Sequence, residues 1–189
     1  LQSTRSSYSE HSVPLYLTSS YAFESAEEAE GKFAGSIDGP IYSRYNNPNT
    51  DELSVKMASL EGAESAVACS SGMAAIFSAL AGVLSQGDHI VCAKAVFGST
   101  YTLLSQVLPR FGIETTFVDL INLSAWEQAI GPKTRAFFIE SPSNPGLMLG
   151  DMAGLSALAR SRNLLVFVDN SFASPWIQNP ISHGAHVVC

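Results

Sequence analysis

Two short segments carry groups that suit the binding of a phosphate. Residues 70–73 read Ser-Ser-Gly-Met at the start of an apolar stretch. Glycine lets the backbone come close to a ligand, and the free N–H groups of a helix start attract an anion. Arg44 stands between Tyr42 and Tyr45, and a guanidinium group can bind phosphate through two hydrogen bonds. Each segment also has an ordinary interpretation, since Ser and Gly cap many helices and Arg44 could be a surface residue.

Three more segments place a functional side chain directly after an apolar run. Asp169 follows one such run, Asn144 stands between two prolines within residues 140–145, and Phe97 follows another run. A carboxylate at a strand end can bind a ribose, a metal ion or a protonated ring nitrogen, and the two prolines would fix Asn144 in a rigid turn. A plain Pro-rich turn and a core position for Phe97 are the simpler alternatives.

The elements that must position these side chains alternate along the chain. Helices are expected at 49–61, 71–84, 99–108, 123–130 and 151–162, and strands at 66–69, 89–92, 114–119, 135–140, 164–168 and 185–188. Continuous apolar strands that alternate with helices indicate a mainly parallel sheet covered on both faces, which is a three-layer α/β/α fold. Such sheets bind ligands at the carboxyl ends of their strands, where the polar segments stand.

Residues 1–48 differ from the rest of the chain. They are rich in Ser, Tyr, Gly and Pro and show little periodicity apart from one short helix expected at 25–32. Their aromatic content favours an arm that is ordered against a neighbouring subunit rather than disordered. The sequence therefore predicts an N-terminal arm over 1–48 and a large domain over 49–189.

Composition excludes several classes of function. The 189 residues carry a net charge of −7 without a Lys/Arg cluster, so a nucleic-acid partner is not expected. No apolar run approaches the ~18 residues of a membrane span, and no secretory leader is recognisable. Only 14% of the residues are charged, against about 25% in an average soluble protein. This low fraction favours a surface that is partly covered by other chain, although a compact α/β domain would also explain it.

The cysteines and histidines do not indicate a metal site. Cys69, Cys92 and Cys189 are an odd number of widely spaced thiols in apolar surroundings, which predicts reduced core thiols in a cytoplasmic protein. His183 and His186 precede Cys189 at intervals of three residues, but strand alternation would not bring all three side chains to one face.

Together these segments resemble the Cys/Met-metabolism family of fold-type I enzymes that use pyridoxal 5′-phosphate (PLP). The resembling segments are residues 42–48, 70–75, 97–100, 140–145 and 168–175. The resemblance implies a fold-type I large domain and the cofactor PLP. The residues that it assigns to cofactor binding are Tyr42, Arg44, Ser71, Gly72, Met73, Phe97, Asn144, Asp169 and Ser171.

The resemblance also implies how the cofactor phosphate is bound. Gly72 and Met73 would donate backbone N–H groups, with Ser71 nearby. Tyr42 and Arg44 would reach the same phosphate from the neighbouring subunit. The protein would therefore be a homo-oligomer: a dimer with shared active sites, which assembles further into a tetramer.

The ring of the cofactor receives three assignments from the same resemblance. Asp169 would pair with the ring nitrogen and keep it protonated, so that the ring can act as an electron sink. Asn144 would bond the ring hydroxyl oxygen, and Phe97 would stack on the ring face. Many family members carry Tyr in place of Phe97. The Phe-Gly-Ser-Thr version looks most like O-succinylhomoserine sulfhydrylases.

The lysine that this chemistry needs is not found within the 189 residues. Lys32, Lys56, Lys94 and Lys133 do not follow a strand end of the right kind. The resemblance places the Schiff-base lysine just after Cys189, so no catalytic residue is expected within the chain and these residues alone should not turn over.

The reaction implied is PLP-dependent γ-replacement in methionine biosynthesis, in which O-succinylhomoserine and sulfide give homocysteine. Alternatives within the family are cystathionine γ-synthase, O-acetylhomoserine sulfhydrylase and a methionine or cystathionine γ-lyase. A different class of protein would be a non-catalytic α/β binding or assembly module. A nucleotide-binding domain is not favoured, because the sequence has neither a G-x-G-x-x-G nor a Walker lysine motif. The chain has His186 where family members usually have Asp, so the resemblance does not predict how the side chains pack at this position.

Overall fold

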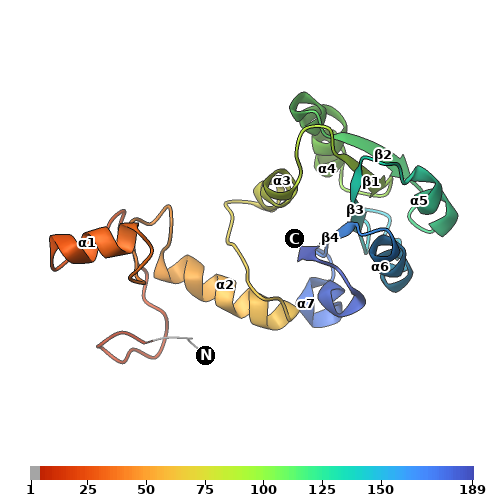
Figure 1. The fold of residues 1–189 in the computed structure, drawn as a ribbon. Helices are drawn as coiled ribbons and strands as arrows, with labels where there is room; N and C mark the ends of the chain where they lie inside the picture. The colour runs from red at the N-terminus through yellow and green to blue at the C-terminus, as the bar shows by residue number, and fades with distance from the viewer. Residues whose placement is uncertain (1–4) are drawn as a thin grey trace. The chain divides into compact units, whose positions relative to one another are not determined.

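The computed structural model describes residues 5–189 and divides the chain into two compact units. The first unit reaches Ser59 and also includes Ala63–Ala68, and the second consists of Leu60–Gly62 and Cys69–Cys189 (Figure 1). The predicted segment boundary after residue 48 lies within the first unit. That the arm contacts a neighbouring subunit stays a prediction.

Of the residues that the structure describes, the first unit contains one whole helix and most of a second, joined to irregular chain. The short predicted helix is confirmed as α1 (Ala26–Phe33), which begins at Ser25, where Oγ accepts the N–H of Glu28 at 3.1 Å. Helix α2 (Pro48–Glu61) ends where Gly62 takes a φ of +68°, a conformation that glycine adopts without strain.

Amide side chains hold the irregular part of the first unit together. Asn47 Nδ2 donates to the carbonyl of Tyr16 at 3.0 Å, and Asn49 Nδ2 donates to the carbonyl of Pro14 at 2.7 Å. An isolated antiparallel bridge joins Ser20 to Tyr42. The arm is therefore fixed mainly by side chain–backbone hydrogen bonds rather than by regular secondary structure.

The second unit is built on a five-stranded parallel sheet, as the sequence predicts. Its strands are β1 (His89–Ala93), β2 (Glu114–Val118), β3 (Thr134–Glu140), β4 (Leu165–Asp169) and β5 (Val187–Val188), in the order β2-β1-β3-β4-β5. β3 and β4 are almost wholly buried, as strands covered on both faces must be. The strand order changes direction between β1 and β3, which makes their carboxyl ends a topological switch point.

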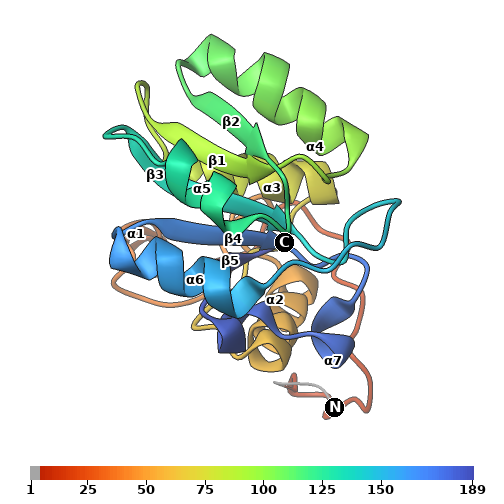
Figure 2. The ribbon, with the colours of Figure 1, turned by 90° about the vertical axis from the view of Figure 1, so that its right-hand side faces the viewer.

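Helices cover both faces of the sheet. They are α3 (Gly72–Val83), α4 (Gly98–Thr102) with its π-helical continuation (Leu103–Val107) and a 3₁₀ turn (Leu108–Phe111), α5 (Leu123–Ala129), α6 (Met152–Ser161), α7 (Ser174–Ile177) and a second 3₁₀ turn (Pro180–His183). Figures 1 and 2 show α5 and α6 on one face of the sheet and α3 on the other. Leu80, Trp126 and Phe137 fill the core between these layers, and the three-layer α/β/α prediction is confirmed.

Several local expectations are wrong. Residues 66–69 form no strand, and Val67 and Cys69 are exposed. Four apolar residues are too few to determine a strand without a neighbouring strand to pair with. Cys69 is therefore not a core thiol, whereas Cys92 is buried and Cys189 is half-buried.

The helix predicted at 99–108 is formed but is not α-helical throughout. After Thr102 the turns widen into the π-helix and then tighten into the 3₁₀ turn. Pro109 lacks the N–H that a continuing helix needs, and Gly112, at φ +74°, ends the segment. The short helices at 174–177 and 180–183 were not predicted, because each is about one turn long and has proline in its first turn. Over residues 5–189, no helix combines the length and the apolar character that a membrane crossing requires.

Candidate functional site

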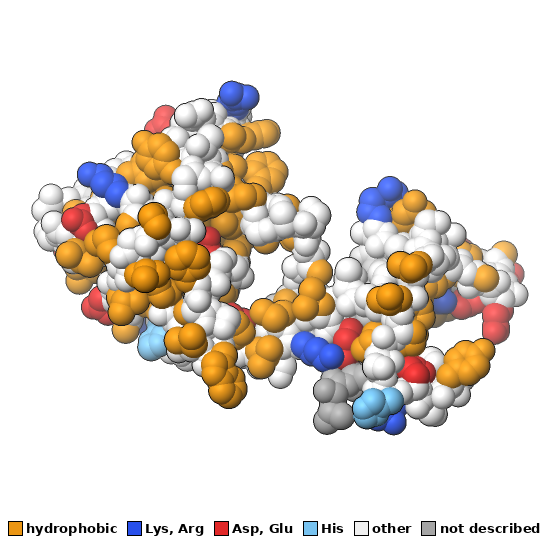
Figure 3. Space-filling view, turned by 180° about the vertical axis from the view of Figure 1, so that it is seen from behind, with side chains coloured by type: hydrophobic (Ala, Val, Ile, Leu, Met, Phe, Trp, Pro, Cys, Tyr) orange, Lys and Arg blue, Asp and Glu red, His pale blue; other side chains and the backbone are white. Residues whose placement is uncertain are grey.

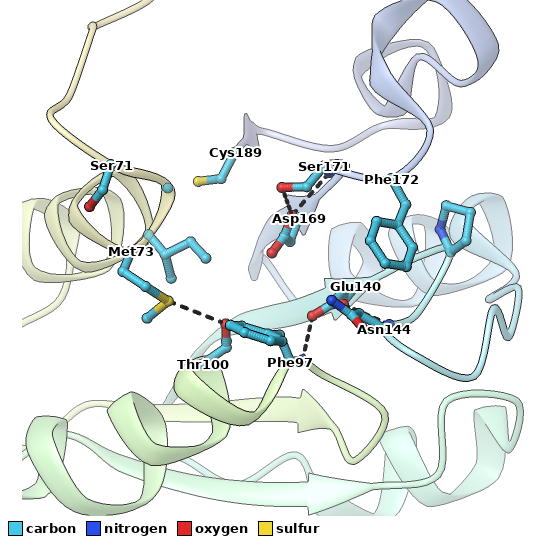
Figure 4. Close-up of a pocket in the computed structure, with 13 residues that line it drawn as sticks. Ser71, Met73, Phe97, Thr100, Glu140, Asn144, Asp169, Ser171, Phe172 and Cys189 are labelled. Carbon is cyan, nitrogen blue, oxygen red and sulfur yellow. Dashed lines mark hydrogen bonds between the residues drawn. The ribbon is translucent and has the colours of Figure 1, made fainter.

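A cavity of about 350 Å³ opens at the carboxyl ends of β1, β3 and β4 in the second unit. It is lined by Ser71, Gly72, Met73, Ile76, Phe97, Thr100, Glu140, Pro142, Asn144, Asp169, Ser171, Phe172 and Cys189 (Figure 4). All the predicted site residues of this unit are among them. The cavity lies at the switch point of the sheet, where open α/β sheets place their ligands.

One end of the cavity is the amino terminus of α3. Ser71 caps this helix, because its Oγ accepts the N–H of Ala74 at 3.1 Å and its carbonyl accepts the N–H of Ala75 at 3.0 Å. Helix geometry leaves the N–H groups of Gly72 and Met73 without an acceptor inside the helix. A Cβ atom on Gly72 would meet no atom within 4 Å. This end therefore offers free donors, the positive end of a twelve-residue helix and room for an anion.

The opposite side of the cavity is acidic. Glu140 and Asp169 are the last residues of β3 and β4, and they are partners in the register of these two strands. They are only 4% and 6% exposed. Parallel neighbours project their side chains to the same face of a sheet about 5 Å apart. Two carboxyl groups are thus placed side by side, in surroundings that favour a cationic group between or beside them.

Asp169 is oriented by Ser171, which lies in the turn directly after β4. Its Oδ1 accepts the N–H of Ser171 at 3.0 Å and the Ser171 hydroxyl at 2.7 Å. Within residues 5–189, its Oδ2 makes no hydrogen bond, and the side chain points into the cavity (Figure 4). Ser171 therefore acts on the cavity through Asp169, while one carboxylate oxygen stays available to a ligand.

Glu140 joins two loops that border the cavity. Its Oε2 accepts the backbone N–H of Phe97 at 2.7 Å, and its Oε1 accepts that of Asn144 at 2.8 Å. Burial raises the pKa of Glu140 most strongly; the hydrogen bonds from the two backbone N–H groups lower the pKa, and the charge of Asp169 raises it. Sequence reasoning gave Glu140 no role, although its place at the end of an apolar strand and before the Pro-rich turn was a usable signal.

Phe97 and Asn144 both reach the cavity. Phe97 is 45% exposed and borders the cavity, so it is not a core residue. The Thr100 hydroxyl lies 3.8 Å from the sulfur of Met73, which connects α4 to the start of α3. Thr100 was not predicted as a lining residue, because it lies inside a helix and follows no strand end directly.

Cys189 is a further lining residue that the sequence did not single out for this place. Burial raises its pKa to about 12, and the charges of Asp169 and Cys69 add to this effect. The thiol therefore stays protonated at neutral pH and is a poor nucleophile.

Tyr42 and Arg44 lie in the first unit. The guanidinium carbon of Arg44 is 4.8 Å from the ring centre of Tyr42 and 5.8 Å from that of Tyr45, which are distances of cation–π contact. In the part of the chain that the structure describes, no ion pair is formed by Arg44. Its positive charge is therefore held by aromatic rings and is open to an anion, while its approach to a cavity stays a prediction.

Comparison with known proteins decides the family. The family model described as "Cys/Met metabolism PLP-dependent enzyme" matches residues 1–189. The chain belongs to this family. The family depends on PLP, which confirms the cofactor that the sequence segments indicated.

Known relatives of this Cys/Met-metabolism chain carry more than one activity. An O-succinylhomoserine sulfhydrylase of Pseudomonas aeruginosa is 45% identical over 179 residues, which are 95% of this chain and 44% of that protein. An L-methionine gamma-lyase of Fusobacterium nucleatum subsp. polymorphum is 46% identical over 182 residues, which are 96% of this chain and 46% of that protein. The chain thus spans somewhat less than half the length of these relatives.

Solved structures agree with the fold. A Campylobacter jejuni protein described as an O-acetylhomoserine (thiol)-lyase, which contains N′-pyridoxyl-lysine-5′-monophosphate, superposes with a TM-score of 0.94 at 34% identity and covers 98% of this chain and 46% of its own. A cystathionine gamma-lyase from Lactobacillus plantarum, complexed with L-serine, gives a TM-score of 0.87 at 36% identity over 95% of this chain and 45% of its own. The second unit is therefore a fold-type I sheet.

Proposed function

We propose that the whole protein is a PLP-dependent γ-replacement enzyme that converts O-succinylhomoserine and sulfide to homocysteine and succinate in methionine biosynthesis. The observation that carries the proposal is the convergence of the α3 amino terminus, Asn144 and Asp169 on one cavity. Similarity to O-succinylhomoserine sulfhydrylases over nearly the whole chain supports the choice of substrate.

The cavity residues fit the two charged ends of PLP. The free N–H groups of Gly72 and Met73, beside open space at Gly72, suit a phosphate. Asp169, with one oxygen free of hydrogen bonds within residues 5–189, suits a protonated ring nitrogen. When bound, PLP supplies an electron sink that stabilises negative charge developing on the substrate.

Four of the cavity residues then have a defined task. Asp169 would hold a proton on the ring nitrogen of bound PLP, and Ser171 keeps Asp169 in orientation through two hydrogen bonds. The side-chain amide of Asn144 would donate to the ring hydroxyl oxygen of bound PLP. Phe97 would stack on the ring face and, having no hydroxyl, could take no part in proton transfer.

The proposal extends to the assembly. Tyr42 and Arg44 complete the phosphate site of a neighbouring subunit in a cytoplasmic homodimer, two of which form a tetramer. The aromatic contacts of Arg44 support a pre-oriented clamp. Large apolar side chains on the surface of each unit, among them Leu17 at 92% and Trp176 at 88% exposure, support cover by other chain. Figure 3 shows many apolar side chains on the visible surface.

A methionine γ-lyase is the second candidate, because a lyase relative is as similar to this chain as the sulfhydrylases are. The two differ in whether a sulfur nucleophile must be added. The test is an assay of the purified full-length protein with O-succinylhomoserine, O-acetylhomoserine, cystathionine and methionine, each with and without sulfide or cysteine. We expect the highest kcat/KM for O-succinylhomoserine with sulfide. Equal turnover of methionine or cystathionine without an added nucleophile would reject the sulfhydrylase assignment.

A simpler observation distinguishes the enzyme from a non-catalytic binding or assembly module. The enzyme requires a lysine in the codons after Cys189, within a Ser-x-Thr-Lys-like run. It also requires that the full-length protein binds PLP with a visible absorbance band, and that borohydride abolishes this band while it fixes the cofactor covalently to the lysine. A stop codon at that place, or the lack of such a band after addition of PLP, would support the module instead.

A further inference from the structure

The buried carboxylate of Glu140 is a cavity feature to which the proposed function gives no task. The side chain is 4% exposed, and both of its oxygens accept a backbone N–H group. One donor, Phe97, belongs to the loop after β1, and the other, Asn144, belongs to the loop after β3. Glu140 is thus the side chain that connects these two loops at the edge of the cavity (Figure 4).

We infer that Glu140 is a positioning residue that sets the distance between Phe97 and Asn144 and so aligns the cofactor ring between its stacking partner and its amide donor. The inference rests on the proposed function, because the cavity must hold PLP for the alignment to matter. It concerns a residue that acts through two others and does not itself touch the reacting atoms.

The chemistry of the two hydrogen bonds explains why a carboxylate is needed at this place. An ionised carboxyl group only accepts hydrogen bonds and has two equivalent oxygens, so it can serve two N–H donors at once. A carboxamide of the same size has one accepting oxygen, and its NH₂ group would face the second N–H donor. Hydrogen bonds to an ionised acceptor are also shorter and stronger than neutral ones, in agreement with the 2.7 and 2.8 Å observed here.

The position of Glu140 beside Asp169 has an electrostatic cost that supports a functional reason. Like charges at neighbouring positions of adjacent strands destabilise a sheet, and the two carboxyl groups are register partners. An apolar residue at 140 would remove this repulsion but would leave the backbone N–H groups of Phe97 and Asn144 without their acceptor. Glu140 is therefore explained if the two hydrogen bonds that align the loops of Phe97 and Asn144 outweigh the repulsion between the carboxylates of Glu140 and Asp169.

The test uses Glu140→Gln in the full-length protein and measures the pH at which the visible absorbance band of bound PLP shifts. If the loop of Asn144 moves, the ring hydroxyl oxygen loses its amide donor and holds its proton more tightly. We expect the midpoint to move upward by about one pH unit and the affinity for PLP to fall about tenfold, the size of one hydrogen bond. A purely structural role would lower the unfolding temperature without moving the midpoint.

Two further variants make the test specific. Glu140→Asp keeps the charge but is one methylene shorter, so it cannot reach both N–H donors; we expect it to shift the midpoint as Gln does. If Glu140→Gln does not fold, the midpoint of Glu140→Asp alone tests whether Glu140 is a positioning residue. In an Asn144→Ala background the amide donor is already absent, and Glu140→Gln should then shift the midpoint no further.

The matched control is Glu127→Gln, which removes an exposed carboxylate that pairs with Arg162 in the same unit. It should leave the midpoint and the PLP affinity unchanged. Midpoints in Glu140→Gln and Glu140→Asp that equal the wild-type value would overturn the inference while leaving the proposed function intact. A wild-type protein that shows no PLP band would instead overturn the proposed function.

Discussion

At the amino end of the sheet, the imidazole of His89 lies between two threonine hydroxyls: Nδ1 is 2.8 Å from Thr134 Oγ1, and Nε2 is 2.9 Å from Thr116 Oγ1. Both ring nitrogens have a partner, and three neighbouring strands are connected. At the carboxyl end, by contrast, Asp169 keeps an oxygen without a hydrogen bond within residues 5–189, and the first N–H groups of α3 lack an intrahelical acceptor.

The same sheet therefore carries one end that is closed and one that is open. In the closed cluster, each polar group satisfies another group of the protein, so substitutions there should change stability. At the open end, donors and acceptors point into a cavity, so substitutions there should change binding and turnover. The following variants test this division.

The largest effect is expected for Asp169→Ala. Loss of the carboxylate removes the group that keeps the ring nitrogen protonated, so kcat should fall by a factor of about 100 or more, as measured in steady-state assays of the full-length protein. The unfolding free energy should change little or rise, because a repulsion with Glu140 is removed as well. Retention of normal kcat would contradict the assignment of Asp169.

Arg44→Ala tests whether the open end is completed by a second subunit. Its loss should weaken PLP binding about 10- to 100-fold, since charge-assisted hydrogen bonds to phosphate are lost; titration followed by visible absorbance measures this. Coexpression of Arg44→Ala with Asp169→Ala subunits should give mixed dimers that regain activity. An unchanged PLP affinity in Arg44→Ala would show that the shared-site proposal is wrong.

Gly72→Ala, compared with a second glycine substitution in α3, separates an effect on PLP affinity from an effect on the unfolding free energy. The added methyl group enters open space beside the α3 amino terminus, where the phosphate is proposed to bind, so PLP affinity should fall about tenfold or more. The matched control is Gly82→Ala in the same helix, where a Cβ also meets no atom within 4 Å. It should raise the unfolding free energy by about 0.5–1 kcal/mol and leave PLP affinity unchanged. Equal PLP affinity in both variants would argue against a phosphate at Gly72.

The smallest effect on function is expected at the closed end. Burial lowers the pKa of His89 below its ordinary value of 6.5, and the charge of Glu114 only partly opposes this. The unfolded chain therefore takes up the proton at a higher pH than the folded protein. The stability that neutral His89 provides is present above pH about 6.5 and is lost as the pH falls through the lowered folded value.

His89→Ala should cost about 1–3 kcal/mol in unfolding free energy at pH 8, because the hydroxyl groups of Thr116 and Thr134 lose their hydrogen bonds to the imidazole, and should retain kcat. Urea unfolding between pH 5 and 8 measures both the cost and its pH dependence, which should be weaker in the variant than in the wild type. His183→Ala, at an exposed position of the same unit, is the control. A fall in kcat with unchanged stability would break the division between the two ends.

Much of this architecture could be predicted from local patterns. Apolar runs separated by helical segments determine that the sheet is parallel and covered, because strands buried on both faces must be apolar throughout. The residues that follow these runs, such as Asn144 and Asp169, then fall at the carboxyl ends, so most of the cavity lining was available from order along the chain. The apolar run at residues 66–69 was predicted as a strand but forms none, because a strand requires a neighbouring strand to pair with and not only an apolar composition.

The amino-acid sequence by itself determined the order of the elements, the family and the residues that meet at the strand ends. Only the tertiary structure decided that Glu140 lies beside Asp169 and holds the N–H of Phe97, a residue 43 positions away in the chain. The physical reason is that strand register and loop-to-loop hydrogen bonds depend on distances between segments remote in the sequence, which no local pattern of residues contains.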